Sequence, residues 1–232
     1  EASPGSGYSV REIDGIELKS GYITPSLLED GKSSIVIEKS SILLLNEELT
    51  HLNECLPMLN ELSNNNRPIL IIAKSVKQEA LNTLVANNKI GRLRVAAIEI
   101  PTFGKNQKEW LDDLSILLGT KVVGNDGVRL RDISIEDLGS ASKVIVSKHS
   151  TRILEGASSQ EKKSAKLSQY RQDSEILISE SDRKDIENRI SFLNGKAAVI
   201  TVGYSTELEL REKGDRIDDA LSATRAAIDE GY

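Results

Sequence analysis

Short runs of β-branched and aliphatic residues alternate along this chain with segments of helical periodicity, and this alternation constrains the fold more than any other feature. The first runs span residues 33–45, 67–73 and 92–100, and each has the length of a strand. Further strand-like runs lie at residues 120–123, 143–147 and 197–202. Strands that alternate with helices are typical of α/β folds. The sequence therefore predicts an α/β fold with sheets flanked by helices.

Helices are predicted from their capping residues and apolar spacing. Ser75 and Gln78 have the spacing of a capping box, which predicts a helix from Ser75 to about Lys89. Pro57 fits best at the first position of a short helix over residues 57–63. Three more helices are expected at residues 105–118, 159–178 and 181–193, the last two as an antiparallel hairpin, and another in the terminal stretch from Arg216.

Charge and composition exclude several kinds of partner. The net charge is -6 and no long basic cluster occurs, so we expect no nucleic-acid binding. The longest apolar runs, such as residues 69–73, are far shorter than the roughly 20 residues of a membrane span, so no membrane partner is expected. The single cysteine, Cys55, excludes an internal disulfide and is expected to be a small buried side chain. Residues 1–9 are rich in Gly and Ser and are expected to form a linker.

Common catalytic and metal-binding motifs are incomplete. Residues 29–34, with the sequence EDGKSS, resemble the end of a phosphate-binding loop, but Ser26 stands where that motif needs a glycine. His51 and His149 have no Cys or His partner at metal-ligand spacing, so no metal site is expected. The same two histidines have no supporting motif for a catalytic triad.

The helix after Ser75 carries more apolar surface than one core-facing stripe requires. One line of residues, which includes Ala80 and Leu84, suffices to pack the helix on a sheet. A second line is formed by Leu81 and Val85 and lies beside Ala86. Two alternatives stay open at this point. Either both lines belong to the core, or the second line forms an exposed apolar patch of the kind that binds a partner.

Four segments, in order along the chain, resemble the group I chaperonins of the GroEL family. They are GIELKSGYITP (15–25), RPILIIAKSVKQEALNTLV (67–85), RVAAIEIPTFG (94–104) and DRIDDALSATRAAIDEG (215–231). The resemblance covers nearly the whole chain. Several departures from the family pattern, such as Ser26 and Lys196, indicate a divergent member.

The resemblance implies a domain organisation. Residues 1–14 would be a linker and the end of a first intermediate-domain segment, residues 15–196 the swivelling apical domain, and residues 197–232 a second, small α+β intermediate-domain segment. The family's ATP-binding equatorial domain has no counterpart here, so we expect a fragment that is a monomer or weak dimer by itself. The intact protein would self-associate into rings. The resemblance is compatible with the bacterial cytoplasm or, alternatively, a mitochondrial or plastid matrix.

The resemblance also implies a function and the residues that perform it. Two apolar helices would form a groove that binds non-native polypeptides and, alternatively, a GroES-like lid co-chaperonin. The expected groove residues are Tyr22, Ser26, Leu27, Leu56, Leu59, Leu81, Val85 and Ala86. Because Ser26 and Leu27 stand where the family has aromatic residues, we expect a smaller patch. A specialised scaffold or adaptor with reduced client binding is the alternative.

Asp219 matches the family's catalytic aspartate, which helps to activate water for ATP hydrolysis. In the intact family, ATP acts with Mg²⁺ and K⁺. Because the expected nucleotide pocket lies in a different domain, we expect this chain alone to bind no cofactor and to hydrolyse no ATP. The neighbouring Asp218 is expected to be a solvated acid near the start of the terminal helix.

Overall fold

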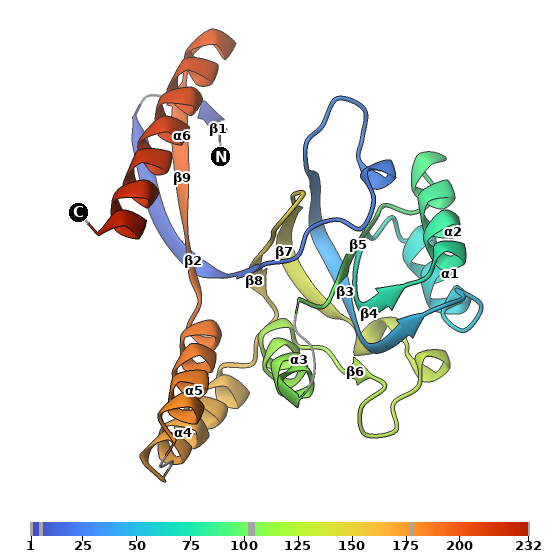
Figure 1. Ribbon diagram of the computed structural model, residues 1–232. Helices are drawn as coiled ribbons and strands as arrows, with labels where there is room; N and C mark the ends of the chain where they lie inside the picture. Colours follow the sequence, from blue (N-terminus) through green and yellow to red (C-terminus); the bar gives the residue numbers. More distant parts are fainter. Residues whose placement is uncertain (1, 5–6, 102–104, 177–178, 232) are drawn as a thin grey trace. The chain divides into compact units, whose positions relative to one another are not determined.

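The computed structural model describes residues 2–4, 7–101, 105–176 and 179–231 of the chain (Figure 1). The described residues fall into two compact units, Asp14–Gly195 and the pair of segments Glu1–Ile13 and Lys196–Tyr232. These boundaries lie one residue from the predicted ones. That the units are an apical and an intermediate domain stays a prediction.

The larger unit is built on a mixed sheet. Its strand order is β2-β8-β7-β3-β4-β5, and the short β6 also pairs with β3. The strands β3, β4, β5 and β6 are parallel, whereas β7 and β8 join the sheet in antiparallel register. The bounds of these strands are β2 Tyr8–Leu18, β3 Ile35–Leu49, β4 Ile69–Val76, β5 Val95–Glu99, β6 Val122–Val123, β7 Gly139–Val146 and β8 Thr151–Gly156.

Helices cover both faces of this sheet (Figure 1). Leu43 and Leu45 of β3 point into a core with α1 (Leu56–Asn64) and α2 (Gln78–Lys89). Ile42 and Leu44 point into a second core, which includes residues of α3, α4 and α5. The bounds of the latter helices are α3 Lys105–Leu118, α4 Gln160–Ile176 and α5 Glu180–Leu193. Alternation of side chains along β3 thus supplies two cores, as expected for a strand buried on both faces.

The described part of the smaller unit contains β1, β9, the first part of β2 and one long helix. Strand β1 (Ala2–Pro4) pairs in parallel with β9 (Lys196–Tyr204), which lies next to β2 in the strand order. Helix α6 (Glu207–Glu230) packs on β9 and begins where the Thr206 side chain accepts a hydrogen bond from the Glu209 amide. Gly231, with a φ of 80°, ends it.

The predicted α/β class with flanking helices is confirmed, as are all six predicted strands, the α4–α5 pair and the buried Cys55. The linker prediction for residues 1–9 was wrong for residues 2–4 and 8–9, which belong to β1 and β2. Strands β2 and β8 were missed, and α6 begins at Glu207, well before the expected start at Arg216. Residues 1, 5 and 6 of the predicted linker, residues 102–104 of a family segment and residues 177–178 of a predicted helix lie outside the described residues.

Candidate functional site

The candidate site lies where α1 and α2 cover one face of the sheet. Helix α1 begins after Cys55, with Pro57 in its first turn, where a missing amide hydrogen costs nothing. It buries Met58, Leu59 and Leu62. Leu56, at the start of the helix, is 41% exposed. The helix therefore presents one large apolar side chain to solvent beside its buried face.

Helix α2 begins three residues later than predicted, and the capping box at Ser75 and Gln78 was wrong. Ser75 and Val76 pair with the end of β3 and extend β4, so that Lys77 is the N-cap residue. Strand pairing along a bulged stretch of β3 prevailed over the local capping signal. The helix ends as predicted near Gly91, whose φ is 71°.

A small cavity opens between α1 and α2. Its volume is about 40 Å³, enough for about one or two water molecules. Leucine side chains from both helices, from the segment before α1 and from the loop after α2 line it, namely Leu52, Leu56, Leu59, Leu84 and Leu93. The polar residues that line it are Asn60, Ser63, Thr83, Asn87 and Arg92. We call these ten residues the α1–α2 groove.

The polar residues of the α1–α2 groove are partly held by backbone contacts. Ser63 donates its hydroxyl hydrogen to the carbonyl of Arg92 at 2.7 Å. Asn87 donates from its side-chain amide to the carbonyl of Thr83 at 2.8 Å. The sequence interpretation missed these residues, although Thr83 and Asn87 lie four apart on one face of the helix. Their regular spacing was the available signal.

Several predicted groove residues are brought together, but inside the protein. Leu27, Leu59 and Leu81 are 1%, 5% and 6% exposed and belong to one core cluster. Val85 is half-buried and packs against the same cluster. Ala86 is exposed. Of the two alternatives for the second apolar line of α2, burial in the core therefore holds for Leu81. Only Ala86, beside the end of this line, is exposed at the surface.

Tyr22 and Ser26 lie on the segment before β3. Tyr22 is half-buried, packs against the core on the other face of the sheet and forms a β-bridge with Ile98. The structure therefore does not group Tyr22 with the helix residues. Ser26 is exposed in a short 3-10 helix, η1 (Pro25–Leu27), and its amide donates to the Thr24 hydroxyl at 3.3 Å.

Two side chains fasten η1 and the residues after it to the unit. Asn88 of α2 donates to the carbonyl of Leu27 at 3.2 Å and accepts from the amide of Val95 at 3.2 Å. Arg94 forms an ion pair with Glu29 at 3.1 Å. Asn88 was not among the predicted site residues. It fixes the C-terminal end of α2 to the segment that carries Ser26.

Charged pairs surround the N-terminal end of α2. Glu48 and Lys77 form an ion pair at 3.0 Å, and the hydrogen bond from Lys77 lowers the pKa of the Glu48 carboxyl below its usual value. His51 lies 3.1 Å from Glu79. Cys55 is buried, and burial raises the pKa of its thiol to about 11. The thiol is therefore protonated near neutral pH and unsuited to nucleophilic chemistry.

Asp219 lies in the smaller unit, on α6. Both Asp219 and Asp218 are exposed. Within the described parts of the chain, no group of three or more His, Cys, Asp or Glu side chains gathers to hold a metal ion. The described residues therefore do not by themselves fit Mg²⁺. The role of Asp219 in water activation stays a prediction.

Among the residues with a described position, every helix is too short or too polar to span a membrane.

Comparison with known protein families places most of the chain in a described family. The model of the family described as TCP-1/cpn60 chaperonin family matches residues 43–232, which is most of the chain. The matched region includes α1, α2 and α6 and begins within β3, after Tyr22, Ser26 and Leu27.

Proposed function

Because the chain belongs to the TCP-1/cpn60 chaperonin family, we propose that the α1–α2 groove binds non-native polypeptides in a chaperonin-type folding reaction. Membership supports the chaperonin-type role, with client polypeptides and ring assembly in general. The exposure of Leu56 beside the opening between the two helices carries the proposal for this groove. An apolar side chain of a client would bury the exposed part of Leu56 and contact the leucines beneath it.

Apolar contact suits a surface that must accept many sequences. Burial of apolar area is non-directional and stabilises a complex by about 25 cal/mol per Å² before the costs of association. The polar groups around the leucines, such as Asn60 and Thr83, have side-chain donors and acceptors for a client backbone. The groove therefore combines sequence-tolerant apolar contact with polar groups that an extended segment requires.

The same proposal includes the other features that the family resemblance implies. A GroES-like co-chaperonin would compete with clients for this surface, and the intact protein would use ATP with Mg²⁺ and K⁺ and assemble into rings. The location would be the bacterial cytoplasm or, alternatively, an organelle matrix.

A specialised scaffold or adaptor is the second candidate, and a specific observation favours it. Leu27, Leu59 and Leu81 are buried in the core, and Ser26 presents a polar side chain on the exposed part of η1. Little of the predicted apolar patch is therefore available to a client without local rearrangement.

Client binding is tested by replacing exposed residues, because changes at buried leucines would also destabilise the fold. Leu56→Ser, alone and with Ala86→Ser, is compared with Val36→Ser, a matched control whose side chain is 39% exposed in the same unit. We expect the unmodified chain to suppress aggregation of denatured clients, the groove variants to suppress it several-fold less, and the Val36 control to behave like the unmodified chain.

The measurement is light scattering during dilution of several unrelated denatured proteins. Equal suppression by the Leu56 variants and the unmodified chain would contradict the groove. Failure of the unmodified chain to suppress any client would instead favour the scaffold. Urea unfolding of every variant identifies changes that act through stability alone.

A further inference from the structure

The wall of the α1–α2 groove contains one positively charged residue. Arg92 follows α2, directly after Gly91, and lines the same cavity as Leu56 and the other leucines. Its side chain is exposed. The other nine residues of the groove, all with described positions, are uncharged leucine, asparagine, serine and threonine residues. The groove therefore combines an apolar floor with a single guanidinium group.

The backbone of Arg92 is fixed to both helices. Its amide donates to the carbonyl of Asn87 on α2 at 3.0 Å. Its carbonyl accepts a hydrogen bond of 2.7 Å from the hydroxyl of Ser63 on α1. The position from which the guanidinium extends is thus set by α1 and α2 together. A ligand that binds this group would not have to order the backbone beneath it, and this lowers the cost of binding.

The guanidinium of Arg92 has no ion pair or hydrogen bond with a side chain in the described part of the chain. The acid of α1, Glu61, is exposed but lies two positions from Leu59 and from Ser63, which both line the groove. Residues two positions apart on a helix point to different sides, so Glu61 faces away from the groove. A ligand with a carboxylate would supply the partner that Arg92 lacks, since the two groups form paired hydrogen bonds.

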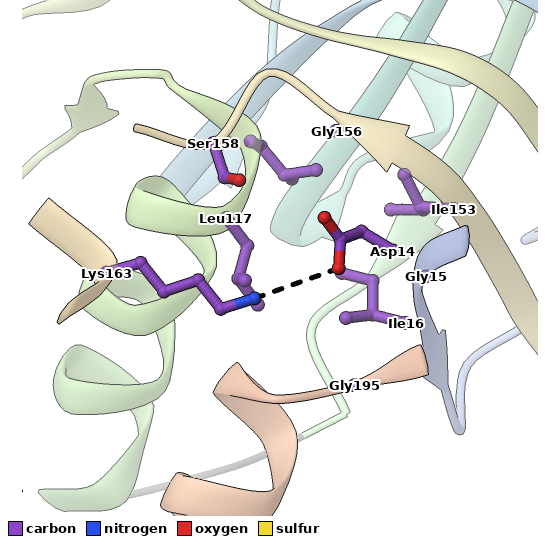
Figure 2. A pocket seen from close by; sticks show the side chains of 10 residues that line it. Asp14, Gly15, Ile16, Leu117, Ile153, Gly156, Ser158, Lys163 and Gly195 are labelled. Carbon is purple, nitrogen blue, oxygen red and sulfur yellow. Dashed lines mark ion pairs between the residues drawn. The ribbon is translucent and has the colours of Figure 1, made fainter. Parts of the chain in front are cut away.

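A second cavity of the same unit shows the contrasting arrangement. Its volume is about 20 Å³, and Leu117 and Ile153 are among the apolar residues that line it (Figure 2). The cation there, Lys163 of α4, is buried and already pairs with a carboxylate of the protein, that of Asp14, at 3.9 Å. The charge in that cavity is compensated within the protein, whereas Arg92 offers its charge to a ligand.

Apolar surface lies next to Arg92 as well. Ile90, the C-cap residue of α2, is 72% exposed. It lies three positions from Asn87 and seven from Thr83, which both line the groove, and so continues the groove face of α2. Leu56, on α1, is 41% exposed. A ligand that reaches Arg92 can therefore bury apolar side chains in the same place.

The small size of the groove limits how far apart the two ligand groups can be. Leu56 and Arg92 line one cavity of about 40 Å³. In an extended segment, side chains two positions apart lie on the same face and are separated by roughly 7 Å, whereas adjacent side chains point in opposite directions. An apolar side chain and a carboxylate two positions apart can therefore both enter the groove, and an adjacent pair cannot.

We propose that the α1–α2 groove selects segments of non-native polypeptide in which an acidic residue stands two positions from an apolar residue. Arg92 binds the carboxylate, Leu56 and the leucines beneath it contact the apolar side chain, and Ile90 extends the apolar contact. This inference rests on the proposed binding of polypeptides at the groove and names the class of segment that the groove takes.

Three short fluorescent peptides test the selectivity, with binding measured by fluorescence anisotropy. Their central sequences are Asp-Thr-Leu-Thr-Asp, Asn-Thr-Leu-Thr-Asn and Thr-Asp-Leu-Asp-Thr. The first presents the carboxylates in the proposed positions for either direction of the segment, the second removes them, and the third keeps the composition and charge but moves the acids next to the leucine. We expect the first peptide to bind roughly two- to five-fold more tightly than the others, as is typical of an exposed ion pair. Added salt should reduce the difference.

Variants of the protein assign the preference to Arg92. Arg92→Gln should bind the Asp and Asn peptides equally, whereas Arg92→Lys keeps the charge without the paired hydrogen bonds and should retain part of the preference. Arg171→Gln removes the same charge from an exposed position of α4, which packs on the other face of the sheet, and should retain all of it. Leu56→Ser should weaken the binding of all three peptides to a similar degree.

The outcomes separate this inference from the proposal on which it rests. Equal binding of the three peptides to the unmodified chain, with weaker binding to Leu56→Ser, would overturn the carboxylate site and leave the groove in place. Failure of every peptide to bind would overturn both. A loss of preference in Arg171→Gln as large as in Arg92→Gln would show that net charge attracts the acidic peptides, and this result would also overturn the role of Arg92.

Discussion

Tyr170 of α4 donates a hydrogen bond of 2.6 Å to Asp113 of α3, a carboxylate whose side chain is only 1% exposed. Arg189 of α5 donates from Nε to the other oxygen of Asp113 at 2.8 Å and stacks over the Tyr170 ring at 4.6 Å. A second carboxylate, Glu109, pairs with the same guanidinium. One buried acid thus joins three helices, and its charge is compensated by two donors.

Tyr170→Phe is expected to lower the free energy of unfolding of the larger unit by about 1–3 kcal/mol. The change leaves one oxygen of buried Asp113 without its donor, which costs the desolvation of that group. Urea unfolding followed by the fluorescence of Trp110, the only tryptophan, measures the effect. The control is Tyr22→Phe, since the structure describes no hydrogen bond for that hydroxyl. A loss as large in the control would show that the bond to Asp113 is unimportant.

The same tyrosine predicts a pH dependence at high pH. Burial, followed by the hydrogen bond to Asp113, raises the pKa of Tyr170 well above its usual value near 10. Above pH 10 the unfolded chain releases this proton while the folded chain keeps it, so stability falls as pH rises. The slope from this group reaches about 1.4 kcal/mol per pH unit. The Tyr170→Phe variant should lack this contribution to the slope of the unfolding free energy against pH. Equal slopes for the variant and the unmodified chain between pH 9 and 11 would contradict the raised pKa of Tyr170.

Asp137 predicts the opposite dependence at low pH. Hydrogen bonds from Lys121 and from the amide and hydroxyl of Ser134 lower the pKa of Asp137 to about 2. Its contribution to stability is therefore complete above pH 4 and disappears as the pH falls towards 2. Asp137→Asn should be less stable than the unmodified chain at pH 7, with a difference that shrinks over this range. A difference that is constant between pH 7 and pH 2 would refute the linkage.

Hydrophobic patterns in the sequence were sufficient to predict most of the fold. The runs at residues 33–45 and 67–73 become two adjacent parallel strands, β3 and β4, because burial on both faces requires continuous apolar residues. The start of α2 was wrongly predicted because the local sequence at Ser75 is compatible with both a helix N-cap and the end of a strand. Only the pairing of Ser75 with β3 decides between the two. Residues 2–4 and 8–9 form strands despite a composition typical of linkers. They were not predicted because their partner, β9, lies about 200 residues away in sequence.

The candidate site was less predictable than the fold. Helical spacing places Leu81 on a second apolar line of α2, but spacing cannot show that the core extends far enough to bury it. The link between Tyr170 and Asp113 spans 57 positions, and the pair of Lys163 with Asp14 about 150. Contacts between polar or charged residues at such separations leave no periodic signal in a single sequence.

Ser41→Ala is expected to stabilise the larger unit by up to about 1 kcal/mol. Ser41 is fully buried in β3, and its hydroxyl has no hydrogen-bond partner among the described residues. A buried hydroxyl without a partner pays the cost of leaving water without compensation. Ser63→Ala, which removes the 2.7 Å bond to the carbonyl of Arg92, should instead destabilise by about 0.5–1.5 kcal/mol. Thermal unfolding of both variants shows whether each change raises or lowers stability. Destabilisation by Ser41→Ala would contradict the cost assigned to the unpartnered Ser41 hydroxyl.

Gly195→Ala is expected to destabilise the larger unit by about 1–3 kcal/mol, because overpacking forces the backbone to move. The added Cβ would lie 2.7 Å from the Gly15 oxygen and 3.1 Å from the Phe192 oxygen, and backbone atoms cannot rotate away. Gly214→Ala is the matched change within α6, where nothing lies within 4 Å of the new atom. Alanine should stabilise that helix by about 0.5–1 kcal/mol through its higher helix propensity. Circular dichroism and Trp110 fluorescence during urea unfolding measure the stability of both variants. An unchanged midpoint for Gly195→Ala would show that the segments around Gly15 and Gly195 can separate at little cost.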